Sequence, residues 1–109
     1  MQAAYIYFLS EVKNKNMLSH APINLQKVKK EEVDKEILRL GMIAELDAVS
    51  LYEQLAAATE NGDIKKMLLD IAKEEKTHMG EFQALLLKSD SEQVKELEAG
   101  RKEVEEKTE

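Results

Sequence analysis

Between residues 31 and 88, apolar side chains recur every three or four positions, which is the period of an amphipathic helix. The first stretch contains no proline over residues 31–60 and ends at Asn61 and Gly62, a pair typical of a left-handed helix C-cap. Asp63 then provides an N-cap for a second helix that runs to about residue 88. Because the connection is so short, the pattern predicts an antiparallel helical hairpin over residues 31–88.

A weaker helical pattern follows the hairpin. The sequence SDSE at residues 89–92 resembles a capping box, with Ser89 as the N-cap and Glu92 at the third helical position. The apolar stripe of this helix consists only of Val94, Leu97 and Val104. We therefore predict a short, thinly packed helix and a charged tail or linker over residues 89–109.

Residues 1–30 show no sustained period and are expected to form an irregular N-terminal extension. We hypothesise that the biological chain starts at Met17. Mass spectrometry showing that the native protein begins at Met1 would contradict this. The expected fold class is all-α, an antiparallel two-helix hairpin plus a short C-terminal helix. With 109 residues, the chain is long enough for one small domain.

Composition narrows the classes of partner and chemistry. The net charge of -6 argues against a nucleic-acid surface, which needs a basic patch, and favours attraction of cations. No apolar run approaches the roughly 18 residues that span a bilayer, so we expect a soluble protein without membrane association. The absence of cysteine is compatible with the cytoplasm, where we expect the protein to lie. Because cysteine is absent, any metal must be held by carboxylates and imidazole.

Each helix of the hairpin carries ionisable side chains on the stripe that should pack. On the second helix, Glu75 and His78 interrupt an apolar line at spacings of three or four residues. That line consists of Ile64, Leu68, Ile71, Glu75, His78, Phe82 and Leu85. The line on the first helix consists of Leu38, Gly41, Glu45, Ala48, Tyr52 and Leu55, and Glu45 is its only carboxylate.

Distance from the turn predicts which of these side chains meet. Both helices rise by about 1.5 Å per residue, so residues at equal sequence distance from the turn lie at similar height. Counted from the Asn-Gly pair, Glu45 lies 16 residues before the turn and His78 lies 16 residues after it. Glu75 lies one helical turn nearer the loop. Tyr52 lies two turns nearer, so its phenol is expected close to this group.

Three converging groups of this kind make a poor apolar core. An unpaired buried carboxylate costs on the order of a few kcal/mol or becomes protonated through a raised pKa. A divalent cation removes the conflict, and these donors suit iron, manganese or zinc, with calcium as a further candidate occupant. Glu75 and His78 form a Glu-x-x-His pair, the spacing used in carboxylate di-metal bundles. We therefore predict Glu45, Glu75 and His78 as metal ligands.

The number of ligands predicts the assembly. One hairpin supplies two carboxylates and one histidine, whereas a di-iron bundle uses four carboxylates and two histidines from four helices. Two copies of the hairpin supply this full set. We therefore predict a homodimer that builds one ferritin-like four-helix bundle, with the metal site on its two-fold axis.

Other charged and soft side chains have ordinary structural explanations. Glu53, Glu74 and Glu81 are expected on solvated helix faces. His20 lies in an aperiodic loop and is not expected to bind metal. Three methionines at helical spacing are expected to pack in the core, namely Met42, Met67 and Met79.

The chain resembles the encapsulated ferritins, ferritin-like ferroxidases confined within encapsulin shells. The resemblance covers about residues 31–100 and rests on Glu45, Tyr52, Glu75 and His78, within GMIAELDAVSLYEQ and LLDIAKEEKTHMGEF. It implies hairpins that dimerise around a di-iron ferroxidase centre and associate into ring-shaped decamers of five dimers. It also implies that Tyr52 acts beside the metals, as a supporting group or a radical quencher.

Two departures from that family affect the expectations. Many members have acidic residues at the positions of Ala44 and Asp47 through which metal enters, so Asp47 is predicted here only as a weaker, secondary metal contact. Free-standing members carry a partly apolar C-terminal tail that docks to the shell, which KELEAGRKEVEEKTE does not resemble. A charged tail suits a linker, so we expect the ferritin-like part of a fusion with the shell protein.

The resulting prediction is a ferroxidase that oxidises Fe(II) to Fe(III) and feeds iron mineral storage inside an encapsulin nanocompartment. One alternative is a rubrerythrin-like peroxide reductase, although such enzymes usually carry a four-cysteine iron site that this chain lacks. Another is a structural oligomerisation hairpin stapled by zinc. Aerobic addition of Fe(II) distinguishes these three functions.

Overall fold

The computed structural model describes residues 24–109, and every regular element in this range is a helix. Two short 3-10 turns, η2 (Leu25–Lys27) and η3 (Lys30–Glu32), precede the long helices α2 (Val33–Ala58) and α3 (Gly62–Ser89). A third helix, α4 (Ser91–Lys107), ends the chain. The predicted all-α fold class is therefore confirmed. His20 and the hypothesised start at Met17 lie outside the described residues, and the division into domains stays a prediction.

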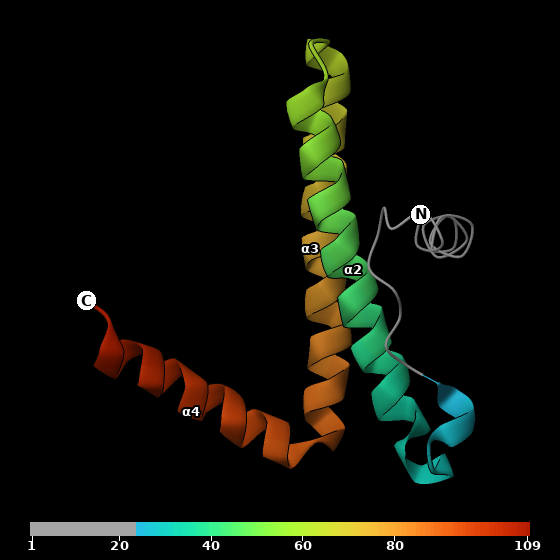
Figure 1. Cartoon of the computed structure of the whole chain (residues 1–109), viewed down its shortest axis with the longest axis vertical. Coiled ribbons are helices and arrows are strands. Elements are labelled where there is room, and N and C mark those ends of the chain that lie inside the picture. The colour runs from blue at the N-terminus through green and yellow to red at the C-terminus, as the bar shows by residue number, and fades with distance from the viewer. Residues whose placement is uncertain (1–23) are drawn as a thin grey trace.

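Helices α2 and α3 run antiparallel along most of their length and form the predicted hairpin, while α4 turns away from it at its open end (Figure 1). Because the two helices are antiparallel, residues far apart in sequence lie at the same height along the hairpin axis. Within residues 24–109, no helix is both long enough and apolar enough to cross a bilayer.

The turn between α2 and α3 differs from its prediction. Helix α2 ends at Ala58, and the extended residue Thr59 caps it with φ -83° and ψ 142°, not a left-handed glycine. Asn61, rather than Asp63, is the N-cap of α3, and its side-chain oxygen accepts hydrogen bonds from the N–H groups of Asp63 and Ile64, both at 3.0 Å. One amide oxygen thus satisfies two of the unpaired donors at the start of a helix, which favours asparagine in this position.

The predicted capping box at the start of the third helix is wrong by one residue. Ser89 ends α3, and Asp90 is the N-cap of α4, accepting from the N–H of Gln93 at 3.0 Å. Arg39 of α2 donates to the other carboxylate oxygen of Asp90 at 3.4 Å, and Asp90 is 8% exposed. The cap residue thus also has a partner on another helix, which local sequence does not reveal.

The core of the hairpin consists mainly of small side chains. Its buried apolar residues are Ala44, Ala48, Ala56, Ala72 and Leu86. Larger apolar side chains on the two long helices are exposed, namely Ile37, Leu46, Leu55, Ile64, Met67, Leu69 and Leu85. The prediction that Met67 packs in the core is therefore wrong for the single chain, whereas Met42 and Met79 are half-buried.

Exposed apolar side chains in this number leave the hairpin with an incomplete core. Monomeric soluble proteins rarely show large contiguous apolar surface, because its exposure to water is unfavourable. Helix α4 has no buried residue, and its whole apolar stripe is exposed, so it adds little packing to the hairpin. The hairpin positions side chains well along its axis but leaves many of its large apolar side chains exposed.

Candidate metal centre

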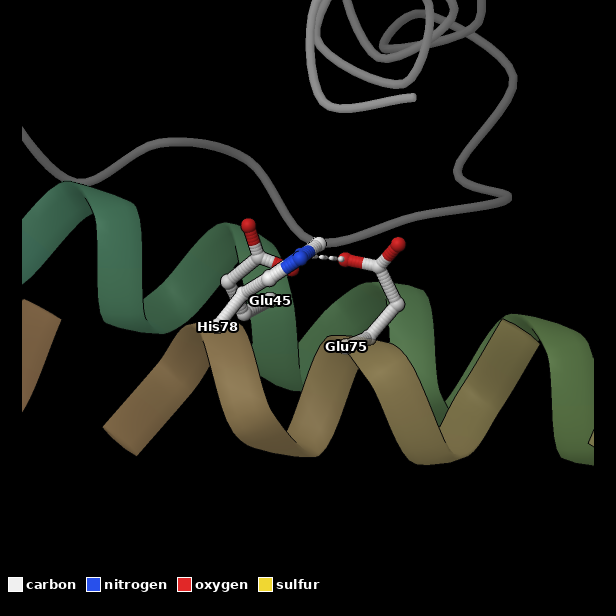
Figure 2. A group of neighbouring side chains, drawn as sticks. All are labelled: Glu45, Glu75 and His78. Atoms are coloured by element: carbon white, nitrogen blue, oxygen red, sulfur yellow. Dashed lines mark hydrogen bonds and ion pairs between the residues drawn. The ribbon is translucent and has the colours of Figure 1, made fainter. Parts of the chain in front are cut away.

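Three predicted metal ligands lie together at mid-height of the hairpin. Glu45 reaches across from α2 toward Glu75 and His78, which lie one turn apart on α3 (Figure 2). One donor atom from each residue lies within 4.8 Å of the other two. His78 Nδ1 is 3.3 Å from Glu75 Oε2 and 3.7 Å from Glu45 Oε2. The equal count from the turn thus brings the three side chains to one level, while their role as ligands stays a prediction.

Burial makes this group unusual for a helical hairpin. Glu45 is 1% exposed and Glu75 is 2% exposed, although charged side chains are almost never fully buried without partners. Among the described residues, neither carboxylate oxygen of Glu45 has a hydrogen-bond partner. The side chain of His78 keeps about a third of its surface exposed, at 33%. The group therefore has one face toward solvent and two carboxylates held away from it.

The electrostatics of Glu45 follow from this burial. Loss of hydration, then the neighbouring carboxylate of Glu75 and the charge of Glu81, raise the pKa of Glu45 from 4.5 to about 8. Without a cation, Glu45 therefore holds a proton at neutral pH. A bound divalent cation would reverse this preference, because it stabilises the ionised carboxylate.

These residues fit a metal ion. The carboxylate of Glu45 is buried with no hydrogen-bond partner among the described residues, and the imidazole nitrogen of His78 lies 3.7 Å from it as a further donor atom for a cation. Two carboxylates with one imidazole form a donor set for first-row divalent metals such as iron, manganese or zinc. The group would hold such an ion with Glu45, Glu75 and His78.

Tyr52 and Asp47, the other two predicted site residues, lie outside this group of three. Tyr52 is half-buried and packs against the buried alanines of α2. Burial and then the charges of Glu75 and Glu45 raise the pKa of its phenol, so the hydroxyl keeps its proton over a wide pH range. Asp47 is half-buried and contributes no donor atom to the group.

One residue near the site has more influence than its sequence position indicated. Glu81 is exposed, as predicted, yet its charge contributes to the raised pKa of Glu45. Glu81 also lines a cavity of about 170 Å³ together with His78, Phe82 and Leu85. Its spacing of three residues from His78 puts both on one face of α3, and this was the sequence signal that Glu81 lies near the site. Glu53 and Glu74 are exposed as predicted, and Glu53 pairs with Lys76 across the helices at 2.9 Å.

Comparison with known proteins identifies the family of this chain. Residues 36–109 match the family model described as Rubrerythrin, so the chain belongs to the rubrerythrin family of ferritin-like proteins.

Within this family, the resemblance to encapsulated ferritins is confirmed. The chain is similar in structure to the encapsulated ferritin domain from Pyrococcus furiosus, with a TM-score of 0.70 and 52% identity, over 84% of this chain and 93% of that one. It is 55% identical over 94 residues to the ferritin-like-encapsulin shell fusion protein of Pyrococcus furiosus, and it is 40% identical over 57 residues to the encapsulin nanocompartment cargo protein EncC of Myxococcus xanthus.

These alignments differ in how much of each protein they include. The first covers 84% of this chain but 27% of the fusion protein, and the second covers 52% of this chain and 44% of the cargo protein. The chain thus spans less than half the length of either curated relative.

Proposed function

We propose that the chain is a ferroxidase that binds Fe(II) as its substrate and oxidises it to Fe(III). The observation that carries this proposal is the buried carboxylate of Glu45, which has no hydrogen-bond partner among the described residues and faces Glu75 and His78. Membership of the rubrerythrin family and similarity to an encapsulated ferritin domain support iron over other divalent metals. Zinc, manganese or calcium would compete for the same donors.

The proposed active unit is a homodimer. One chain offers three donors, half of the set used by di-iron bundles, and the exposed apolar side chains of α2 and α3 leave a surface for a second hairpin. Two chains would complete a four-helix bundle with a di-iron centre at their interface. The resemblance to encapsulated ferritins further implies a ring-shaped decamer of five such dimers.

The charges of the site favour the product of the reaction. Each Fe(II) ion gives one electron to dioxygen or another oxidant, and two ions held side by side supply two electrons. Glu45 must release its proton when a cation binds, because its pKa is raised to about 8 in the metal-free protein. Once ionised, Glu45 and Glu75 stabilise Fe(III) more than Fe(II), since the attraction grows with cation charge. We also propose, from the resemblance to encapsulated ferritins, that the phenol of Tyr52 acts as a supporting group or quenches radicals.

The proposed setting is an encapsulin nanocompartment in the cytoplasm. One relative is named as a fusion of a ferritin-like part with an encapsulin shell, and the other is named as an encapsulin cargo protein. A two-helix subunit encloses no space of its own for mineral, so iron storage would need such a shell. We further propose that the charged residues after α3 form a linker to a shell protein. Loading of the unfused domain into shells would contradict this last point.

Aerobic Fe(II) oxidation, followed by the absorbance of Fe(III), tests the main proposal. Glu45→Ala and His78→Ala are each expected to slow oxidation at least about 100-fold, because each removes a donor from every half-site. Glu74→Ala is the matched control, since it removes a neighbouring carboxylate that is exposed and outside the group. Oxidation at the parental rate in either ligand variant would falsify the assignment.

A rubrerythrin-like peroxide reductase is the second candidate, and the match to the Rubrerythrin family model favours it. The 109 residues contain no cysteine for the electron-delivering iron site that such enzymes usually carry. Turnover that requires hydrogen peroxide and fails with dioxygen would support this alternative. Absence of any iron oxidation, with zinc bound tightly, would instead support a structural hairpin.

A further inference from the structure

A close contact between Gly41 and Phe82 lies one helical turn from the ligand group, on the side away from the loop. A Cβ atom placed on Gly41 would lie 2.8 Å from Phe82 Cδ1 and 2.9 Å from its Cε1 and Cγ. Ordinary van der Waals contact begins at 3.4 Å. Glycine is therefore required for the ring to rest against α2 at this separation of the helices.

The ring has little freedom to avoid an added methyl group. Rotation about χ2 turns the edges of the ring but leaves Cγ in place, and Cγ is itself within 2.9 Å of the added atom. Relief needs either a change of χ1 or a displacement of α3 from α2. A displacement of about 0.6 Å would restore a 3.4 Å contact, which exceeds the roughly 0.2 Å tolerance of metal–ligand distances.

Phe82 also lines the same cavity as the imidazole of His78. Its ring and His78 line one cavity of about 170 Å³ on α3. Gly41 lies four residues before Glu45, and Phe82 lies four residues after His78, so the contact spans both helices next to the two facing donors. A change of χ1 would alter the wall beside His78, and a shift of the helix would move His78 away from Glu45.

We propose that Gly41 and Phe82 are positioning residues: their contact, one helical turn from the ligand group, sets the separation of α2 and α3 and thereby the distance between Glu45 and His78. This inference rests on the proposed metal site. The contact holds the imidazole and the carboxylate close enough to share one ion, since His78 Nδ1 and Glu45 Oε2 are 3.7 Å apart. Neither residue touches the metal.

The test is a double-mutant cycle on the 109-residue chain, with Co(II) alone as the probe. Gly41→Ala is expected to weaken Co(II) binding at least about tenfold and to change the visible absorption of the bound ion. Phe82→Leu alone is expected to weaken binding about threefold, because it removes the ring that fixes the spacing. The double variant is expected to bind within about twofold of the parent, since the new methyl group fills space left by the smaller side chain.

Gly80→Ala is the matched control. Gly80 lies in α3 two residues from His78, and a Cβ on it meets nothing within 4 Å. The same exchange there should leave the Co(II) spectrum and affinity unchanged. A purely structural role for Gly41 would lower the stability of the metal-free protein but leave the spectrum of the bound ion unchanged, and that result would overturn the proposal.

Two further results would also overturn it. One is parental Co(II) affinity in Gly41→Ala, and the other is a double variant that binds no better than the single variants. If Gly41→Ala does not fold, the comparison of Phe82→Leu with the double variant decides the question alone. Failure of the metal site itself is recognised separately, because Glu45→Ala and His78→Ala would then bind Co(II) as tightly as the parent.

Discussion

Replacing Glu45 by glutamine is expected to stabilise the metal-free protein at pH 8 while it abolishes metal binding. The pKa of Glu45 rises from 4.5 in the unfolded chain to about 8 in the folded one, chiefly through burial. Between these two values the folded protein binds more protons than the unfolded chain. The free energy of unfolding therefore falls as pH rises through this interval, and the loss is complete above pH 8. Glutamine stays neutral throughout and has no such dependence.

The size of the effect follows from the same interval. One pKa unit corresponds to about 1.4 kcal/mol, so the upper limit for Glu45 is roughly 5 kcal/mol. Rearrangement of the hairpin and entry of water around the ionised carboxylate reduce this, and we expect a measured difference of about 2–4 kcal/mol at pH 8. That is a large share of the roughly 5–15 kcal/mol that stabilises a typical domain.

The assay is urea unfolding followed by circular dichroism, with a chelator present, at fixed protein concentration between pH 5 and pH 9. Subtracting the free energy of unfolding of the parent from that of the variant cancels the contributions of the other titrating groups. This difference should widen toward pH 8. Zn(II) should restore the stability of the parent at pH 8 and leave the stability of Glu45→Gln unchanged. A difference that stays flat, or that narrows as pH rises, would refute the account of a buried, protonated Glu45.

Further predictions concern proton release and the helix caps. Zn(II) binding at pH 7 should release close to one proton per chain from Glu45, because its pKa is about 8 without metal, and calorimetry in buffers of different ionisation enthalpy measures this number. Asp90→Ala should destabilise the protein by about 1–2 kcal/mol in urea unfolding, since it removes the N-cap of α4 and the partner of an arginine, whereas Ser89→Ala should cost less than about 0.5 kcal/mol. Asn61→Ala should cost about 1 kcal/mol and Asp63→Ala clearly less, and equal costs would contradict the observed cap.

The helix caps show the limit of local sequence reasoning. Ser89 and Asp63 are good cap residues by type, yet Asp90 and Asn61 hold these positions. At Asp90 the tertiary structure adds a second contact, because Arg39 of another helix donates to the carboxylate that also caps α4. Spacing alone predicts where one helix ends and the next begins, but not which of two neighbouring polar residues makes the capping hydrogen bond.

The packing faces show a related limit. The apolar period predicted that Met67 and Leu85 pack, whereas both are exposed in the single hairpin. The period reports which residues prefer burial, not which surface provides it. Alanines bury most completely because α2 and α3 approach closely where side chains are small.

By itself, the sequence determined the hairpin and the level at which Glu45 meets Glu75 and His78. A helix has a fixed rise per residue, so counting from a short turn converts sequence distance into height. Only the tertiary structure decided how buried this group is and what surrounds it. Burial raises the pKa of Glu45, and its carboxylate oxygens have no hydrogen-bond partner among the described residues. The close approach of Phe82 to Gly41 is also a tertiary feature. These properties depend on atoms brought in from the facing helix, and periodicity within one helix carries no information about them.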